Sequence, residues 1–155
     1  MGIWDKSVGI LKDKTDSLDD VSKYQKALLK TFSFTSIGGG SGASTILLYI
    51  AQYLSIVEKK QVMVLDLNFL QPDLLYNMNV DVTADNSILN YIKGSKTLES
   101  CFIEDEQIKN LHLLTASPKD SMMLLMSVKP DDNTIGKILN QLEMFDYVLL
   151  NLPYM

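Results

Sequence analysis

The stretch Ile37-Gly38-Gly39-Gly40-Ser41-Gly42-Ala43-Ser44-Thr45 decides which fold the sequence predicts. It follows a short β-type run, Thr31 to Ser36, and leads into a strongly apolar helical run, Ile46 to Val57. Glycines let the backbone turn tightly with its N–H groups converging on one point, and the helix expected to start at Ser44 adds the positive end of its dipole. The order of strand, glycine loop and helix therefore predicts a phosphate-binding loop, with a glycine-rich turn that holds no ligand as the alternative.

The loop differs from the usual P-loop, G-x-x-x-x-G-K-[ST], because its spacing is shorter and Ala43 stands where the lysine belongs. It resembles the deviant P-loop K-G-G-x-G-K-[ST]-[ST] of the ParA/MinD family of ATPases, with both family lysines missing. The eight aligned positions are Gly38, Gly39, Gly40, Ser41, Gly42, Ala43, Ser44 and Thr45. Alanine in place of the second lysine is similar to the atypical CpaE/TadZ proteins, which localise and assemble Tad-type (Flp) pili.

A second stretch, Asp66 to Leu74, follows the continuously apolar run Gln61 to Asp66, which predicts a strand buried on both faces. It resembles the second family signature, D-x-D-x-x-x-P-x-L, with Asn68 in place of the second aspartate. The resemblance implies that Asp66 keeps part of a catalytic and metal-binding role, whereas an asparagine at position 68 cannot act as a base. A helix cap beyond the strand is the simpler interpretation of Asp66.

A third stretch, Phe145 to Pro153, is similar to the family's F-D-Y-V-I-I-D-x-P, the Walker B strand whose last acid binds Mg²⁺ through water. Asn151 takes the place of that acid. The resemblance implies a Mg²⁺ site formed by Ser44, Asp66 and Asn151 that has lost ligand charge. Three signatures in the correct order span Thr31 to Pro153, and each has lost a charged group.

Composition limits the remaining possibilities. The chain has 155 residues, of which 46% are hydrophobic and 21% charged, as in one ordinary globular domain. Cys101 and His112 are each the only residue of their type, so we expect core or sheet-face positions for them and no disulfide. No apolar run approaches the ~18 residues of a membrane-spanning helix, and no signal-peptide core is present, so a cytoplasmic protein is expected.

The charge pattern weighs against nucleic-acid binding. The net charge is −5, and all 14 basic residues are lysines. A basic face that neutralises phosphates is therefore not expected, nor is an arginine finger.

The predicted fold is a three-layer α/β domain of the P-loop NTPase type, with a mostly parallel sheet and helices on both faces. Its strands are expected at about 31–36, 62–66, 111–115 and 147–151, with the first and last of these as neighbours. Short helices are expected over Ser87 to Ile92, ended by Gly94, and after Asp132 or Asn133. Residues 1–30 are expected to form a linker and helix, and residues 31–155 the N-terminal part of a ParA/MinD-like domain.

The functional hypothesis is a localisation or assembly factor for pilus secretion that binds ATP and Mg²⁺ weakly or not at all and hydrolyses little ATP. Its expected partners are pilus assembly and secretion proteins, through which it would be recruited to the membrane or the cell pole. One alternative is an active partitioning-type ATPase or a capsule-type tyrosine kinase, and another is a nucleotide-free interaction module.

A homodimer is also expected, and it should not depend on nucleotide, because Gly38 has no side chain with which to reach a partner's phosphates. The expected contacts are Met122 to Met126, the Trp4 segment, or the sheet edge left open because the chain ends four residues after Asn151.

Overall fold

The structure is a computed structural model that describes residues 30–69, 73–78, 80–120, 123 and 133–153. The chain divides into two units, Met1–Lys30 and Thr31–Met155, and the second is described below. The Trp4 segment lies outside the described residues, as does most of the methionine-rich run 122–126. The domain boundary expected at residue 30 stays a prediction.

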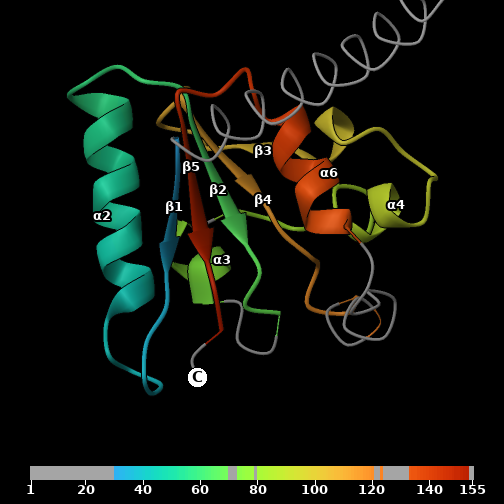
Figure 1. The fold of residues 1–155 in the computed structure, drawn as a ribbon, viewed down its shortest axis with the longest axis horizontal. Coiled ribbons are helices and arrows are strands. Elements are labelled where there is room, and N and C mark those ends of the chain that lie inside the picture. Colours follow the sequence, from blue (N-terminus) through green and yellow to red (C-terminus); the bar gives the residue numbers. More distant parts are fainter. Residues whose placement is uncertain (1–29, 70–72, 79, 121–122, 124–132, 154–155) are drawn as a thin grey trace, which may run out of the picture. The chain divides into compact units, whose positions relative to one another are not determined.

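Five strands form one sheet in the order β1-β5-β2-β4-β3 (Figure 1). Their bounds are β1 Thr31–Phe34, β2 Val62–Asp66, β3 Ile103–Glu104, β4 Leu111–Leu114 and β5 Tyr147–Asn151. All neighbouring strands are parallel except β3, which pairs antiparallel with β4. The four predicted parallel strands and the pairing of β1 with β5 are confirmed. The edge strand β3 was not predicted, because a strand of two residues is too short to show an alternating pattern.

Helices cover both faces of the sheet, so the predicted three-layer α/β fold is confirmed (Figure 1). Apolar residues of α2 and α3 pack on one face, and those of α4 and α6 pack on the other. The helix bounds are α2 Ala43–Ile56, α3 Asp73–Met78, α4 Leu89–Ile92 and α6 Thr134–Gln141, with a 3₁₀ turn at Glu99–Cys101. The helix α3 was not predicted, although Leu74, Leu75 and Met78 have the same helical spacing as Ile88, Leu89 and Ile92.

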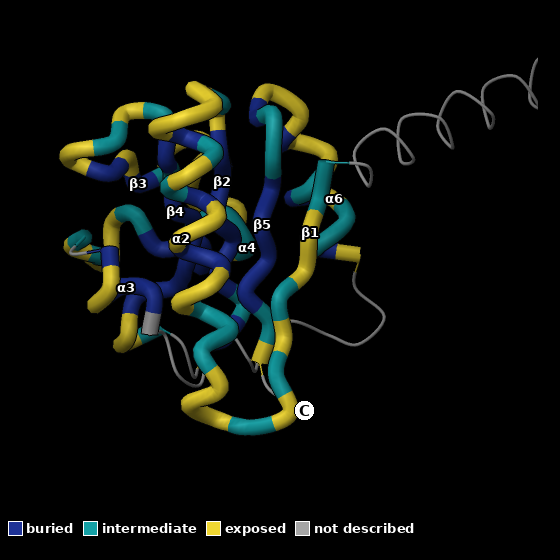
Figure 2. The backbone as a smooth tube through the Cα atoms, turned by 90° about the vertical axis from the view of Figure 1, so that its left-hand side faces the viewer, coloured by how far each residue is buried: buried dark blue, intermediate teal, exposed yellow. Residues whose placement is uncertain are grey.

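The central strands are buried because both of their faces are covered. In β2, Met63 and Leu65 join one core cluster, while Val62 and Val64 join the other. Alternation of side chains between the two faces explains why the whole strand is apolar. The edge strand β1 is less covered, as Figure 2 shows, and Phe32 is half-exposed.

Candidate phosphate-binding site at the carboxyl edge of the sheet

The glycine loop connects β1 to the N-terminus of α2. Gly40 and Gly42 adopt positive φ angles of 77° and 84°, which favour glycine, whereas Gly38 and Gly39 do not. The Gly42 carbonyl accepts the Ile46 N–H at 2.9 Å. No side chain caps the start of α2, and no acidic residue lies in its first turn. The positive end of the helix dipole is therefore not neutralised by the helix itself.

The loop forms one wall of a pocket of about 310 Å³. The ends of β2 and β5 and the helix α3 supply the other walls. The lining residues are Ser36, Gly39, Gly40, Ser41, Gly42, Ala43, Ser44, Thr45, Asn68, Tyr76, Asn77, Asn151 and Leu152. Among these, none carries a charged side chain. An anion held here would rely on backbone N–H groups, hydroxyls, amides and the helix dipole.

A chain of hydrogen bonds links the helix to the two strand ends. The Ser44 hydroxyl donates to Asn151 Oδ1 at 3.3 Å, and Asn151 Nδ2 donates to Asp66 Oδ1 at 2.9 Å. The Asn68 backbone N–H donates to the same carboxylate oxygen at 3.0 Å. Asp66 and Asn151 also pair in register across β2 and β5, and both are completely or almost completely buried.

Asn68 lines the pocket, and its side-chain oxygen is buried. Its residue is only 7% exposed, and the structure shows no hydrogen-bond partner for its side-chain oxygen among the described residues. Buried polar atoms almost always find a partner in protein, water or ligand. The oxygen is therefore available to a group that enters the pocket.

Most of the residues predicted for the site lie around this pocket, and two do not line it. Gly38 borders an adjoining apolar hollow with Phe34, Ile37 and Ile46. Asp66 lies beneath the pocket and reaches it through Asn151.

The α3 residues Tyr76 and Asn77 also line the pocket, and the sequence analysis did not identify them, because α3 itself was missed. The described residues contain no group of three or more His, Cys, Asp or Glu side chains placed to hold a metal ion.

Cys101 and His112 lie away from the pocket, in the positions expected for them. Cys101 is buried in the core, and burial raises the pKa of its thiol. His112 lies on β4 with its ring 5.2 Å from that of Phe145, and burial lowers its pKa.

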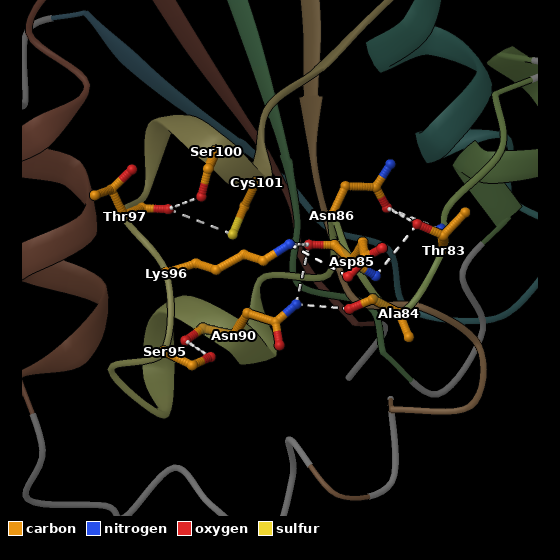
Figure 3. A network of polar contacts seen from close by, with 10 residues as sticks. All are labelled: Thr83, Ala84, Asp85, Asn86, Asn90, Ser95, Lys96, Thr97, Ser100 and Cys101. Carbon is orange, nitrogen blue, oxygen red and sulfur yellow. Dashed lines mark hydrogen bonds and ion pairs between the residues drawn. The ribbon is translucent and has the colours of Figure 1, made fainter.

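A second set of polar contacts lies within the segment 83–101 (Figure 3). Asn90 Nδ2 donates to the backbone oxygens of Ala84 and Asp85 at 2.6 and 3.1 Å. Lys96 Nζ donates to the Asp85 backbone oxygen at 2.8 Å and lies 3.4 Å from its carboxylate. These bonds close a surface loop upon itself, and none of these residues lines the pocket.

Comparison with known proteins finds relatives of the fold. No protein-family model matches the chain. Three solved structures are similar in fold, namely apo McdA from Cyanthece, the MinC:MinD cell division protein complex from Aquifex aeolicus, and a protein from Borrelia burgdorferi described as a plasmid partition protein bound to AMPPNP. Their TM-scores are 0.66, 0.59 and 0.64, at identities of 22%, 23% and 20%. The chain has a ParA/MinD-like fold.

A sequence relative points to the same superfamily. The chain is 30% identical over 89 residues to a virulence plasmid ParA family protein of Chlamydia psittaci, a match that covers 57% of this chain and 34% of that protein. The fold matches cover 80–81% of this chain and 48–52% of the three solved chains. The chain thus spans about half the length of its ParA/MinD-like structural neighbours. None of the described helices is long and apolar enough to cross a bilayer.

Proposed function

We propose that this ParA/MinD-like domain binds a nucleotide by its phosphates and hydrolyses it little or not at all. The observation that carries the proposal is the loop in which Gly40 and Gly42 adopt positive φ angles at the uncapped start of α2, beside a polar pocket. Backbone N–H groups and a helix dipole bind phosphate whatever the side chains are. The AMPPNP in one structural neighbour supports a nucleotide as the ligand.

Weak hydrolysis follows from the pocket's lack of charge. Phosphoryl transfer depends on positive groups around the transferring phosphate, and one such residue is worth roughly 10³–10⁵ in rate. Ala43 and Gly38 stand where the resemblance places lysines, and Asn68 and Asn151 stand where it places acids. Without a base at position 68, an attacking water would be poorly oriented.

A pair of glycine variants tests the proposal. In Gly42→Ala, a side chain is forced into a positive φ, which should distort the loop and weaken Mg-ATP binding at least about tenfold, a change of 1.4 kcal/mol. Gly38→Ala is the matched control, because Gly38 lies in the same loop without a positive φ, does not line the pocket, and a Cβ there meets no atom within 4 Å. Calorimetric titration measures the binding, and phosphate release measures the turnover.

Two results would contradict the proposal. A flat titration of the unmodified protein at millimolar Mg-ATP would favour a nucleotide-free interaction module. Phosphate release that disappears in Gly42→Ala would show an active ATPase.

The biological role is proposed on the finer resemblance to CpaE/TadZ proteins, on which Ala43 in the loop bears most directly. The domain would act as a cytoplasmic localisation and assembly factor of Tad-type pili, recruited to the membrane or cell pole by pilus secretion proteins. Plasmid or chromosome partitioning is the second candidate, because the sequence relative is a plasmid ParA family protein. Co-purification of the tagged full-length protein with pilus secretion components supports the first role, and co-purification with plasmid DNA would overturn it.

A further inference from the structure

Asn151 stands where the family resemblance places an acid that binds Mg²⁺ through water, and this inference rests on the proposed phosphate binding. Mg²⁺ is held in proteins by carboxylate oxygens and waters in a near-octahedral arrangement. The residues that the family resemblance assigns to Mg²⁺ are Ser44, Asp66 and Asn151. Their donor set is one hydroxyl, one amide and one carboxylate that does not line the pocket.

The hydrogen bonds around Asp66 fix the orientation of that amide. Asp66 Oδ1 accepts from Asn151 Nδ2 at 2.9 Å and from the Asn68 N–H at 3.0 Å. Since a carboxylate only accepts, the nitrogen of the Asn151 amide must face Asp66. Its oxygen then faces Ser44 and accepts the hydroxyl proton at 3.3 Å. The amide therefore connects a buried acid to the start of α2 by direct bonds.

A buried carboxylate requires a compensating partner, either a cation or hydrogen-bond donors. Here two donors of the protein itself, the Asn151 amide and the Asn68 backbone N–H, bond Oδ1 of Asp66. We propose that Asn151 takes the place of a divalent cation at the ends of β2 and β5, so that the pocket binds phosphate without Mg²⁺.

The substitution Asn151→Asp should reverse this property. It would place a carboxylate oxygen where Nδ2 now lies, 2.9 Å from Asp66 Oδ1. Two carboxylates at that distance can both stay ionised only if a cation lies between them, and without a cation one of them must bind a proton, which costs free energy at pH 7.5. The variant should therefore require a divalent cation that the unmodified protein does not need.

The matched control is Asn140→Asp. It makes the same chemical change on an exposed residue of α6 that does not line the pocket. Any effect of one added negative charge on the whole protein appears in both variants. An effect confined to Asn151→Asp belongs to the strand ends.

The first measurement is thermal unfolding in EDTA and in Mg²⁺ at pH 7.5, which needs no nucleotide. The melting temperatures of the unmodified protein and of Asn140→Asp should be the same in both buffers. Asn151→Asp should melt lower in EDTA and recover when Mg²⁺ is added. The inference would be overturned if Mg²⁺ raised the melting temperature of the unmodified protein. It would also be overturned if Mg²⁺ left the melting temperature of Asn151→Asp unchanged.

The second measurement is calorimetric titration with ADP in the same two buffers. We expect dissociation constants within about threefold of each other for the unmodified protein and more than about tenfold apart for Asn151→Asp, where tenfold equals 1.4 kcal/mol. If the unmodified protein released or absorbed heat of ADP binding only in the presence of Mg²⁺, the inference would be overturned, while the proposed nucleotide binding would still stand. If no heat of ADP binding were measured in either buffer, the proposed function would be overturned, together with the inference that the pocket binds phosphate without Mg²⁺. The melting comparison would then still decide whether Asn151 takes the place of a cation.

Discussion

The two polar networks of this domain differ in what they contribute. The network at the strand ends joins Ser44, Asn151 and Asp66 by few bonds, and the latter two residues are at most 1% exposed. The network of residues 83–101 has many bonds, but its ion pair is open to water, with the side chains of Lys96 and Asp85 exposed by 37% and 94% (Figure 3).

The comparison shows that burial, more than the number of bonds, determines how much free energy a polar contact contributes to stability. In the surface loop, water can replace each lost partner, so a broken bond costs little. At the strand ends water is excluded, and a donor left without its acceptor loses its full hydration. The buried network is also the one that lies against the pocket, so its changes should alter binding as well as stability.

The largest effect is expected from Asp66→Ala. This substitution leaves Asn151 Nδ2 and the Asn68 N–H without their acceptor, and each buried unsatisfied group costs about 1–3 kcal/mol. The free energy of unfolding, measured by urea denaturation, should fall by roughly 2–6 kcal/mol. Asp66→Asn is the control, because an amide oxygen still accepts both bonds, so its loss should be clearly smaller. Equal losses in the two variants would mean that the negative charge of Asp66, which both variants remove, matters here and the acceptor oxygen, which asparagine keeps, does not.

The second effect is expected from Ala43→Lys. Ala43 lies in the first turn of α2 and lines the pocket, so an ammonium group there could reach a bound phosphate. A charge-assisted hydrogen bond contributes about 1.5–3 kcal/mol, which tightens ATP binding by roughly 10- to 100-fold. Turnover should stay at background, because Asn68 and Asn151 remain.

Gln52→Lys controls for the added charge, because Gln52 lies on the same helix but does not line this pocket. Calorimetry compares the three proteins. A gain in Gln52→Lys equal to that in Ala43→Lys would show that the charge acts at long range, through the net charge of the domain.

The sequence predicted the parts of this molecule that depend on local pattern. The run Val62–Asp66 is apolar at every position before its acid, as expected for a strand covered on both faces, and the glycine loop marks the turn into α2. The antiparallel strand β3 was missed because two residues are too short to establish a period. The helix α3 was missed although Leu74, Leu75 and Met78 have helical spacing, a signal that could have found it.

The direction of bonds in the site was also beyond the sequence. Asn151 was recognised as a replaced acid, but nothing in a linear pattern shows that its nitrogen bonds Asp66 and its oxygen bonds Ser44. That information needs the register of β2 against β5, which places residues 66 and 151 side by side. Asp66 does not line the pocket and is connected to it by the bond from Asn151.

The smallest effect is expected from Lys96→Ala, which breaks the ion pair of the surface network. Exposed pairs contribute about 0–1 kcal/mol, since water and salt screen them. Asn90 Nδ2 continues to hold the backbone oxygens of Ala84 and Asp85 after Lys96 is removed, so the loop keeps its anchor.

Urea denaturation at low and high salt measures the effect of Lys96→Ala. Lys137→Ala is the control, because Lys137 is an exposed lysine on α6 with no ion pair among the described residues. We expect the two variants to lie within about 1 kcal/mol of the unmodified protein, and any difference between them to vanish at high salt, where the Debye length falls to about 3 Å. A loss for Lys96→Ala close to that for Asp66→Ala would contradict the comparison, because it would show that an exposed pair can contribute as much as a buried network.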